Sequence, residues 1–281
     1  MILTISVIIP IYNLNSTDSL SYFNNLIGSI ALNINENTHY KIQEIIIVDD
    51  SPVATNQTEV NLILDQLKEL CNVKYIVNSK NSGQAFSRNI GASVSNSDYF
   101  HFIDQDDLIS ARFYENLLLN NGNFDILMSD CLHLSEPNKS FYKFITKSFF
   151  KRANNFCQLR PFLINNIANS PGQYLVKKSL FLKVSGFPIL INNGSDDFGI
   201  FLRFIKIKHS FKFVDQSKFY YRTHKHQSSN ILNMRLSERN AFIEHNYSIF
   251  DLMFWIKLIK LNSFFSPLRI LIYKLFYATF K

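Results

Sequence analysis

The residues best suited to chemistry form an acidic cluster, Asp104-Gln105-Asp106-Asp107, which directly follows a short apolar run. Carboxylates packed this closely repel one another unless a cation neutralises them. Mg²⁺ is commonly held by one or two carboxylates together with phosphate oxygens, and Mn²⁺ accepts the same ligands. The cluster therefore predicts a Mn²⁺ or Mg²⁺ site at which the metal bridges a diphosphate and offsets the charge on a departing group. The alternative is a solvated acidic turn that caps the next helix.

Two further polar segments could serve such a site. Asp49-Asp50 precedes Ser51-Pro52, and a carboxylate there could accept hydrogen bonds from a base or ribose, or could equally belong to an ordinary turn. The segment 81–91 spans a loop and a helix in which Gly83 permits close backbone approach. The helix N-terminus and Arg88 could attract phosphate or orient acidic neighbours, and ordinary helix capping is the alternative. The segment matches neither a Walker A loop nor GxGxxG.

Apolar runs and amphipathic stretches alternate through the first half of the chain. Strands are expected at 5–11, 44–48, 73–77 and 99–103, and helices at 19–34, 60–70 and 83–94. This alternation predicts an α/β fold with a mostly parallel sheet and helices on both faces. Ligands of such sheets bind beyond the carboxyl ends of the strands. The polar residues expected at that edge are Tyr12, Asn13, Asp49, Asp50, the segment 78–81 and the acidic cluster.

The second half of the chain is less regular. A strand is expected at 124–128, a loop and strand at 169–177, and helices at 178–184 and 196–207. Two short strands are expected at 211–215 and 219–222. From residue 239 onwards the pattern is helical and aromatic.

Four motifs fall in order at matching distances: VIIPIYN (7–13), IVDDSP (47–52), NSGQAFSRNIG (81–91) and FIDQDD (102–107). As a set they resemble glycosyltransferase family 2, whose members have the GT-A fold and invert the configuration of the transferred sugar. The resemblance covers roughly the first 110 residues. It implies a nucleotide-sugar donor, with UDP the expected nucleotide. This chain departs from the family in having Ser51-Pro52 for the commoner Gly-Ser, and Ser87 where Ala is usual.

The resemblance also implies roles for individual residues. Pro10, Tyr12 and Asp50 would lie around the base and ribose. Asp104 and Asp106 would be the paired acids of the DxD motif, with Asp106 the direct metal ligand. Further donor-binding residues are expected among Asn13, Asp49, Asn81, Gly83, Arg88 and Gln105.

The second half matches the family more weakly. Asn169-Ser170-Pro171-Gly172 resembles its acceptor-side segment, and Ser195-Asp196-Asp197-Phe198 resembles its Glu-Asp motif. Asp196 replaces Glu, and Gly199 stands where an acid is common. The resemblance makes Asp197 the general base that takes the proton of the attacking acceptor hydroxyl, beside the substrate-binding Asp196. A helix N-cap with acids in its first turn is the alternative.

The segment Tyr221-Arg222-Thr223-His224 resembles a late motif of the family. It would let Arg222 pair with phosphate oxygens and His224 touch the metal or the diphosphate. A solvated histidine in a basic loop is the alternative.

Composition limits the expected binding partners and the cellular compartment. The net charge of +7 suits anionic partners but does not choose among them, and no nucleic-acid partner is expected. Three cysteines without CxxC spacing argue against a disulfide frame or zinc site and fit the cytoplasm. No stretch reaches the length of a transmembrane helix. The aromatic and basic segment 250–281 has the pattern of helices lying on an anionic membrane, or packing on the domain or across a dimer.

The sequence therefore predicts a GT-A domain at 1–235, with a nucleotide-sugar half (1–110) and an acceptor-side half (111–235), followed by a basic amphipathic helical segment at 236–281. The expected activity is inverting transfer to a glycan or polyprenyl-linked acceptor in cell-surface polysaccharide synthesis, at the inner face of a bacterial membrane. The alternatives are a sugar-phosphate nucleotidyltransferase and a catalytically inactive scaffold. The oligomeric state stays open.

Overall fold

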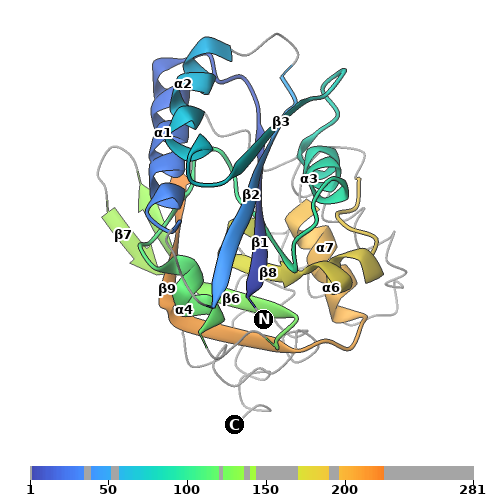
Figure 1. Ribbon diagram of the computed structural model, residues 1–281. Coiled ribbons are helices and arrows are strands. Elements are labelled where there is room, and N and C mark those ends of the chain that lie inside the picture. The colour runs from blue at the N-terminus through green and yellow to red at the C-terminus, as the bar shows by residue number, and fades with distance from the viewer. Residues whose placement is uncertain are drawn as a thin grey trace, which may run out of the picture.

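The computed structural model describes residues 2–34, 39–51, 57–119, 123–135, 140–143, 170–189 and 196–224. Within these ranges nine strands form a single sheet flanked by helices (Figure 1). The strand order is β3-β2-β1-β4-β8-β6-β9-β5, with β7 paired to β6. The expected α/β class is confirmed. The helical segment expected at 236–281 lies outside the described residues.

The first half of the chain supplies four parallel strands: β1 (Leu3–Ile11), β2 (Tyr40–Asp49), β3 (Asn72–Val77) and β4 (Tyr99–Phe102). The runs in β1, β2 and β4 are almost continuously buried because helices cover both faces of the sheet. Ile11 pairs with Asp49, and Asp49 pairs with Val77, so these carboxyl ends lie level. The loops that follow them therefore meet at one edge, as the sequence predicts.

Helices of the described ranges cover both faces of the sheet (Figure 1). On one face lie α1 (Thr17–Ala31), α2 (Gln57–Lys68) and α4 (Phe113–Leu118). On the other lie α3 (Gln84–Ser93), α6 (Lys178–Lys183) and α7 (Asp196–Ile205). Helix α3 approaches the sheet closely through Gly91, where an added Cβ would lie 2.4 Å from Ile8 Cγ2. This close approach brings the residues at the start of α3 to the edge where the strands end.

The second half of the chain extends the same sheet. After β5 (Leu108–Ile109), which still belongs to the first half, it contributes β6 (Ile126–Ser135), β7 (Ser140–Lys143), the 3-10 turn η2 (Pro171–Gln173), β8 (Tyr174–Lys177) and β9 (Phe211–Thr223). Strand β8 runs antiparallel between β4 and β6 and so joins the two halves. Strands β1 to β4, β6 and β9 share one direction, so the sheet is mostly parallel, as expected.

The two strands expected at 211–215 and 219–222 form one strand, β9. The prediction of a break was wrong because the chain bulges there without leaving the sheet: Ser129 pairs with Val214, but the next residue, Asp130, pairs with Lys218. Lys218 Nζ donates to Asp130 Oδ2 at 2.8 Å and to the Asp215 carbonyl at 2.5 Å. Strands β5 and β7 and helix α4 were not predicted, and β5, with two residues, is too short to show a period.

A buried histidine ties η2 to the sheet. His101 of β4 is fully buried, with Nε2 2.8 Å from the Gly172 carbonyl and Nδ1 2.8 Å from the Tyr114 hydroxyl. Because a carbonyl only accepts, Nε2 carries the proton and Nδ1 accepts from Tyr114. Burial lowers the pKa of His101 to about 4. None of the helices in the described ranges is long and apolar enough to cross a membrane.

Candidate active site

The acidic loop after β4 is fastened at two of its residues. The carboxylate of buried Asp107 accepts a hydrogen bond from the backbone N–H of Arg222 at 2.9 Å. Burial, followed by the neighbouring Asp106 and Asp104, raises the pKa of Asp107 well above its usual range. The amide of Gln105 pairs with the backbone of Tyr12, accepting at 2.7 Å and donating at 3.1 Å. Asp107 and Gln105 thus hold the loop between β9 and the end of β1.

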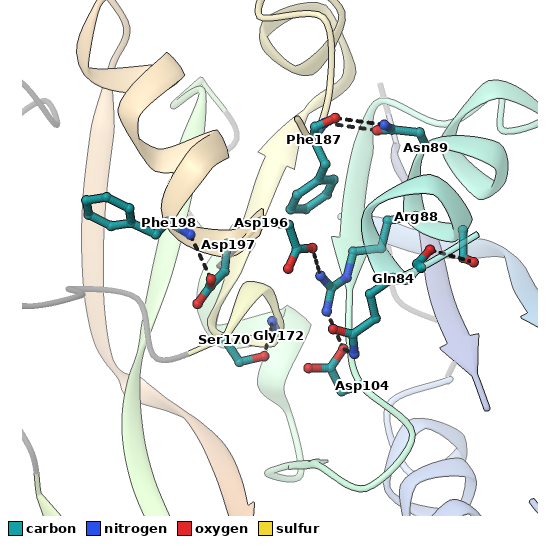
Figure 2. A network of polar contacts seen from close by, with 12 residues as sticks. Gln84, Arg88, Asn89, Asp104, Ser170, Gly172, Phe187, Asp196, Asp197 and Phe198 are labelled. Atoms are coloured by element: carbon teal, nitrogen blue, oxygen red, sulfur yellow. Dashed lines mark hydrogen bonds and ion pairs between the residues drawn. The ribbon is translucent and has the colours of Figure 1, made fainter. Parts of the chain in front are cut away.

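Arg88 of α3 connects two acids from distant parts of the chain. Its NH1 pairs with Asp196 at the start of α7 and its NH2 pairs with Asp104 (Figure 2). Asp104 also accepts from Gln84 Nε2 at 3.3 Å. Burial lowers the pKa of Arg88, but Asp104 and Asp196 outweigh this and raise it. Burial raises the pKa of Asp104 against the opposing effect of Arg88. Arg88 therefore orients acidic neighbours, one of the two roles predicted for it.

Asp50 holds the loop that leads into α3. Its carboxylate accepts from the N–H of Ser82 at 2.8 Å, the N–H of Gly83 at 2.7 Å and the side-chain amide of Asn78 at 2.7 Å. Gly83 has a φ of 88°, which favours glycine. The amide of Asn78 also donates to Ser87 Oγ at 2.9 Å. Ser87, where the family usually has Ala, thus adds a hydrogen bond to the Asp50 network.

The ends of β1 and β2 are joined around Ser51. Asp49 accepts from the Ser51 N–H at 2.9 Å, from its hydroxyl at 2.5 Å and from the Tyr75 hydroxyl at 2.6 Å. Ser51 Oγ accepts from the N–H of Asn13, whose φ of 51° is left-handed. The adjacent Tyr12 is 44% exposed, so its ring is available to a ligand. Asp49 itself therefore mainly fixes the junction between the ends of β1 and β2.

The end of β9 meets the acidic loop. Arg222 Nε donates to the backbone carbonyl of Asp106 at 2.7 Å, and its guanidinium carbon lies 4.4 Å from the ring centroid of Tyr22. His224 Nε2 lies 2.9 Å from Asp106 Oδ2, and its ring centroid is 5.0 Å from that of Tyr22. Tyr22 of α1 therefore contacts both residues that face Asp106.

The donor groups fit a divalent cation shared with a ligand. Asp106 and His224 present a carboxylate and an imidazole side by side. Among the described residues of the site, the carboxyl groups outnumber the guanidinium groups of Arg88 and Arg222; these acids are Asp104, Asp106, Asp107, Asp196 and Asp197. No described group of three or more His, Cys, Asp or Glu side chains is arranged to hold a metal. A cation would therefore need ligand oxygens, such as those of a diphosphate.

Asp197 lies in the first turn of α7, where the N–H of Phe198 donates to its Oδ1 at 2.8 Å (Figure 2). After burial, Asp197 is the largest influence raising the pKa of Tyr174. The pKa of Tyr221 is raised first by burial and then by Asp107, Asp104, Asp106 and Asp197. Because Arg88 pairs with both Asp104 and Asp196, the start of α7 lies beside the acidic loop, and Asp197 is the next residue of that helix.

The remaining predicted residues are less informative. Pro10 is buried within β1, and Asn81 is exposed in the loop before α3. Ser195 and Asn169 lie outside the described ranges. Sequence reasoning missed Tyr22, Gln84 and Asn89. Tyr22 reads as an ordinary position on an amphipathic helix, and Asn89 as a surface amide beside Arg88, so no local signal singles them out.

The topology and the position of the acids define a GT-A-type sheet with its site at the carboxyl edge. Residues 6–166, more than half of the chain, match the model of the family described as "Glycosyl transferase family 2", and the chain belongs to this family. It is 28% identical over 158 residues to an uncharacterised glycosyltransferase of Haemophilus influenzae, covering 54% of this chain and 49% of that relative. The chain thus spans about half the length of this curated relative.

Solved structures share the fold. S. aureus TarS (residues 1–349) superposes with a TM-score of 0.66 at 18% identity, covering 93% of this chain and 72% of TarS. The same protein in complex with UDP-GlcNAc gives a TM-score of 0.66 at 18% identity over 93% of this chain and 73% of TarS. Its complex with UDP gives 0.61 at 19% identity, over 93% and 70% respectively.

Proposed function

We propose that this chain is an inverting glycosyltransferase that uses a sugar activated by a nucleoside diphosphate, with UDP as the nucleotide. The observation that carries the proposal is the convergence of Asp106, His224, the Arg88-linked acids and Asp197 at the carboxyl edge of a family 2 sheet. The TarS structures with UDP-GlcNAc and UDP support the choice of nucleotide.

The chemistry assigned to the chain is one displacement. The acceptor oxygen forms a bond to the anomeric carbon while the bond from that carbon to the diphosphate oxygen breaks, and the electron pair leaves with the diphosphate. Asp197 takes the proton of the acceptor hydroxyl. Arg88 holds Asp104 and Asp196 together, one at each end of its guanidinium. Tyr12 is exposed at the end of β1, next to the loops that Asp49 and Asp50 hold, and would contact the nucleoside.

Asp106 and His224 would hold the divalent cation, Mn²⁺ or Mg²⁺, together with diphosphate oxygens. When bound, the ion would neutralise the charge that develops on the departing diphosphate. The mixed carboxylate and imidazole set suits Mn²⁺ better than Mg²⁺, because Mg²⁺ strongly prefers oxygen ligands.

The proposed acceptor is a glycan or polyprenyl-linked hydroxyl used in cell-surface polysaccharide synthesis. The supporting feature is the basic aromatic segment 250–281, which would place the enzyme on the inner face of the membrane. Removing 250–281 is expected to release the protein from liposomes containing anionic lipid, measured by co-sedimentation. Equal sedimentation of the full and shortened chains would contradict the membrane assignment.

Donor hydrolysis tests the activity without knowledge of the acceptor. A panel of nucleotide sugars that includes UDP-GlcNAc is incubated with Mn²⁺ or with EDTA, and released nucleotide is measured. The proposal expects slow, metal-dependent release from at least one UDP-sugar. A nucleotidyltransferase would instead form pyrophosphate from a nucleoside triphosphate and a sugar phosphate. An inactive scaffold would show neither reaction.

A further inference from the structure

Three consecutive residues of α3 contact three different parts of the candidate site. Ser87 joins the Asp50 network, Arg88 joins Asp104 to Asp196, and Asn89 contacts the segment between α6 and α7. The amide of Asn89 donates to the Phe187 carbonyl at 2.8 Å and accepts from the Phe187 N–H at 2.9 Å (Figure 2). One side chain thus satisfies both backbone groups of Phe187, as a neighbouring strand would.

The turn held by Asn89 is shaped to fit it. Gly186 has a φ of 67°, and a Cβ there would lie 2.5 Å from Asn89 Oδ1. The Phe187 ring packs edge-on against Phe102, with centroids 4.9 Å apart, and lies 5.3 Å from the Arg88 guanidinium carbon. Asn89 therefore fixes the backbone of Phe187, and Phe102 and Arg88 fix its ring. Both lie on the face of the sheet that α3 covers.

The same turn supports α7. Arg203, in the last turn of α7, donates through NH1 to the carbonyls of Val184, Ser185 and Gly186 at 3.3, 3.0 and 2.8 Å. In the first turn of α7, a Cβ on Gly199 would lie 2.4 Å from Pro188 Cγ. Gly199 replaces an acid common in the family, and the buried ring of Pro188 explains why: no side chain fits there.

These contacts form a path from α3 to the candidate base. Asn89 holds Phe187, the adjacent Pro188 packs on Gly199, and Gly199 follows Asp197 by one turn or less of helix. We propose that Asn89 is a positioning residue that sets the place of Asp197 relative to the acidic loop. This inference rests on the proposed function, because it assigns Asp197 a proton to remove.

The sharpest variant is Asn89→Asp. It keeps an acceptor for the Phe187 N–H but sets an oxygen against the Phe187 carbonyl, so one hydrogen bond is lost and a repulsion replaces it. Displacement of a reacting group by about 1 Å costs roughly 100-fold in rate. We therefore expect Mn²⁺-dependent UDP-GlcNAc hydrolysis to fall about 10- to 100-fold, with UDP affinity changed less than about twofold.

The control is Ser93→Ala on the same helix, because Ser93 is exposed and its hydroxyl donates to the carbonyl of Ile90 in its own helix.

A double-mutant cycle with Asp197→Asn separates positioning from general damage. If Asn89 acts through Asp197, Asn89→Asp has little further effect once Asp197 is Asn. If Asn89→Asp lowers turnover equally in the wild-type and Asp197→Asn backgrounds, the proposal is overturned. Loss of UDP binding in Asn89→Asp would also overturn it, because the effect would then lie on Arg88 and donor binding. Full turnover by Asp197→Asn alone would also overturn it.

A measurement independent of turnover completes the test. Amide hydrogen exchange across 196–203 is expected to speed up in Asn89→Asp and to stay unchanged in Ser93→Ala. Unchanged exchange in the Asn89 variant would overturn the proposed link to α7. If the wild-type protein turns over no UDP-sugar, the proposed function fails, and the exchange data still decide whether Asn89 positions α7.

Discussion

Arg88 joins Asp104, just after β4, to Asp196, at the start of α7, through a guanidinium whose side chain is only 1% exposed. The two acids are 92 residues apart in sequence and belong to the two halves predicted for the chain. One buried cation therefore sets the spacing between the donor-side loop and the helix that carries Asp197. Because both carboxylates depend on it, neither can shift without leaving a charge unpaired.

Replacing Arg88 tests this bridge. Lysine offers one compact ammonium and can pair fully with only one of the two acids. Arg88→Lys is expected to lower donor turnover by about 100-fold or more, and Arg88→Met to lower the free energy of unfolding by roughly 3–5 kcal/mol. Turnover assays and urea denaturation measure the two effects. The exposed Arg112→Lys is the control, since Arg112 forms only a loose pair with Glu115 at 3.6 Å. Near-normal Arg88→Lys turnover would show that the bridge is dispensable.

Asp106→Asn tests the proposed metal ligand. The amide keeps the shape of the side chain but removes the charge that faces His224. Mn²⁺-stimulated UDP affinity, measured by calorimetry, is expected to fall at least about tenfold, while metal-free UDP binding stays the same. Asp65→Asn, on the exposed face of α2, serves as the control. Metal stimulation that survives in Asp106→Asn would exclude this residue as a ligand.

The ring of Tyr22 is expected to support the same ligand pair. It lies against both the Arg222 guanidinium and the His224 ring, and a cation–π contact contributes about 0.5–2 kcal/mol. Tyr22→Leu should therefore weaken Mn²⁺-dependent UDP binding by roughly 2- to 30-fold, whereas Tyr22→Phe retains the ring and most of the affinity. Titration of UDP with and without Mn²⁺ compares the two variants. Equal affinities for Leu and Phe would rule out a role for the ring.

The buried neutral His101 predicts a pH dependence of stability. Its pKa falls from 6.5 to about 4 in the fold, so the unfolded chain takes up a proton first as the pH drops. Its contribution is complete above pH 6.5 and is lost between 6.5 and about 4, amounting to roughly 3 kcal/mol. His101→Gln can still donate to Gly172 but does not titrate.

Denaturant unfolding from pH 7.5 to 4 compares this variant with the parent protein. The raised pKa values of Asp104 and Asp107 act in the opposite direction but are common to both proteins, so the difference isolates His101. We expect the parent protein to lose more stability than His101→Gln as the pH falls. Parallel pH curves would show that His101 does not titrate as described.

Local pattern was enough to predict much of this protein. The runs around Ile8, Ile46 and Phe100 are apolar because helices cover both faces of the sheet. Such runs alternate with amphipathic helices along the chain, and this order predicts parallel strands whose carboxyl ends meet at one edge. The acidic loop, the Asp50 corner and the start of α3 fall at those ends, so their proximity follows from the order of elements. Strand β5 escaped prediction because two residues cannot display a period.

The roles within the site were decided by tertiary contacts. Asp104, Asp106 and Asp107 are one residue type in one loop, yet Asp104 meets Arg88, Asp106 faces His224 and Asp107 binds a backbone N–H of β9. Tyr22 and Asn89 enter the site only because α1 packs beside the end of β9 and α3 packs beside the turn after α6. Periodicity reports which face of an element is buried, but the partner of a polar side chain depends on which distant segment packs against it.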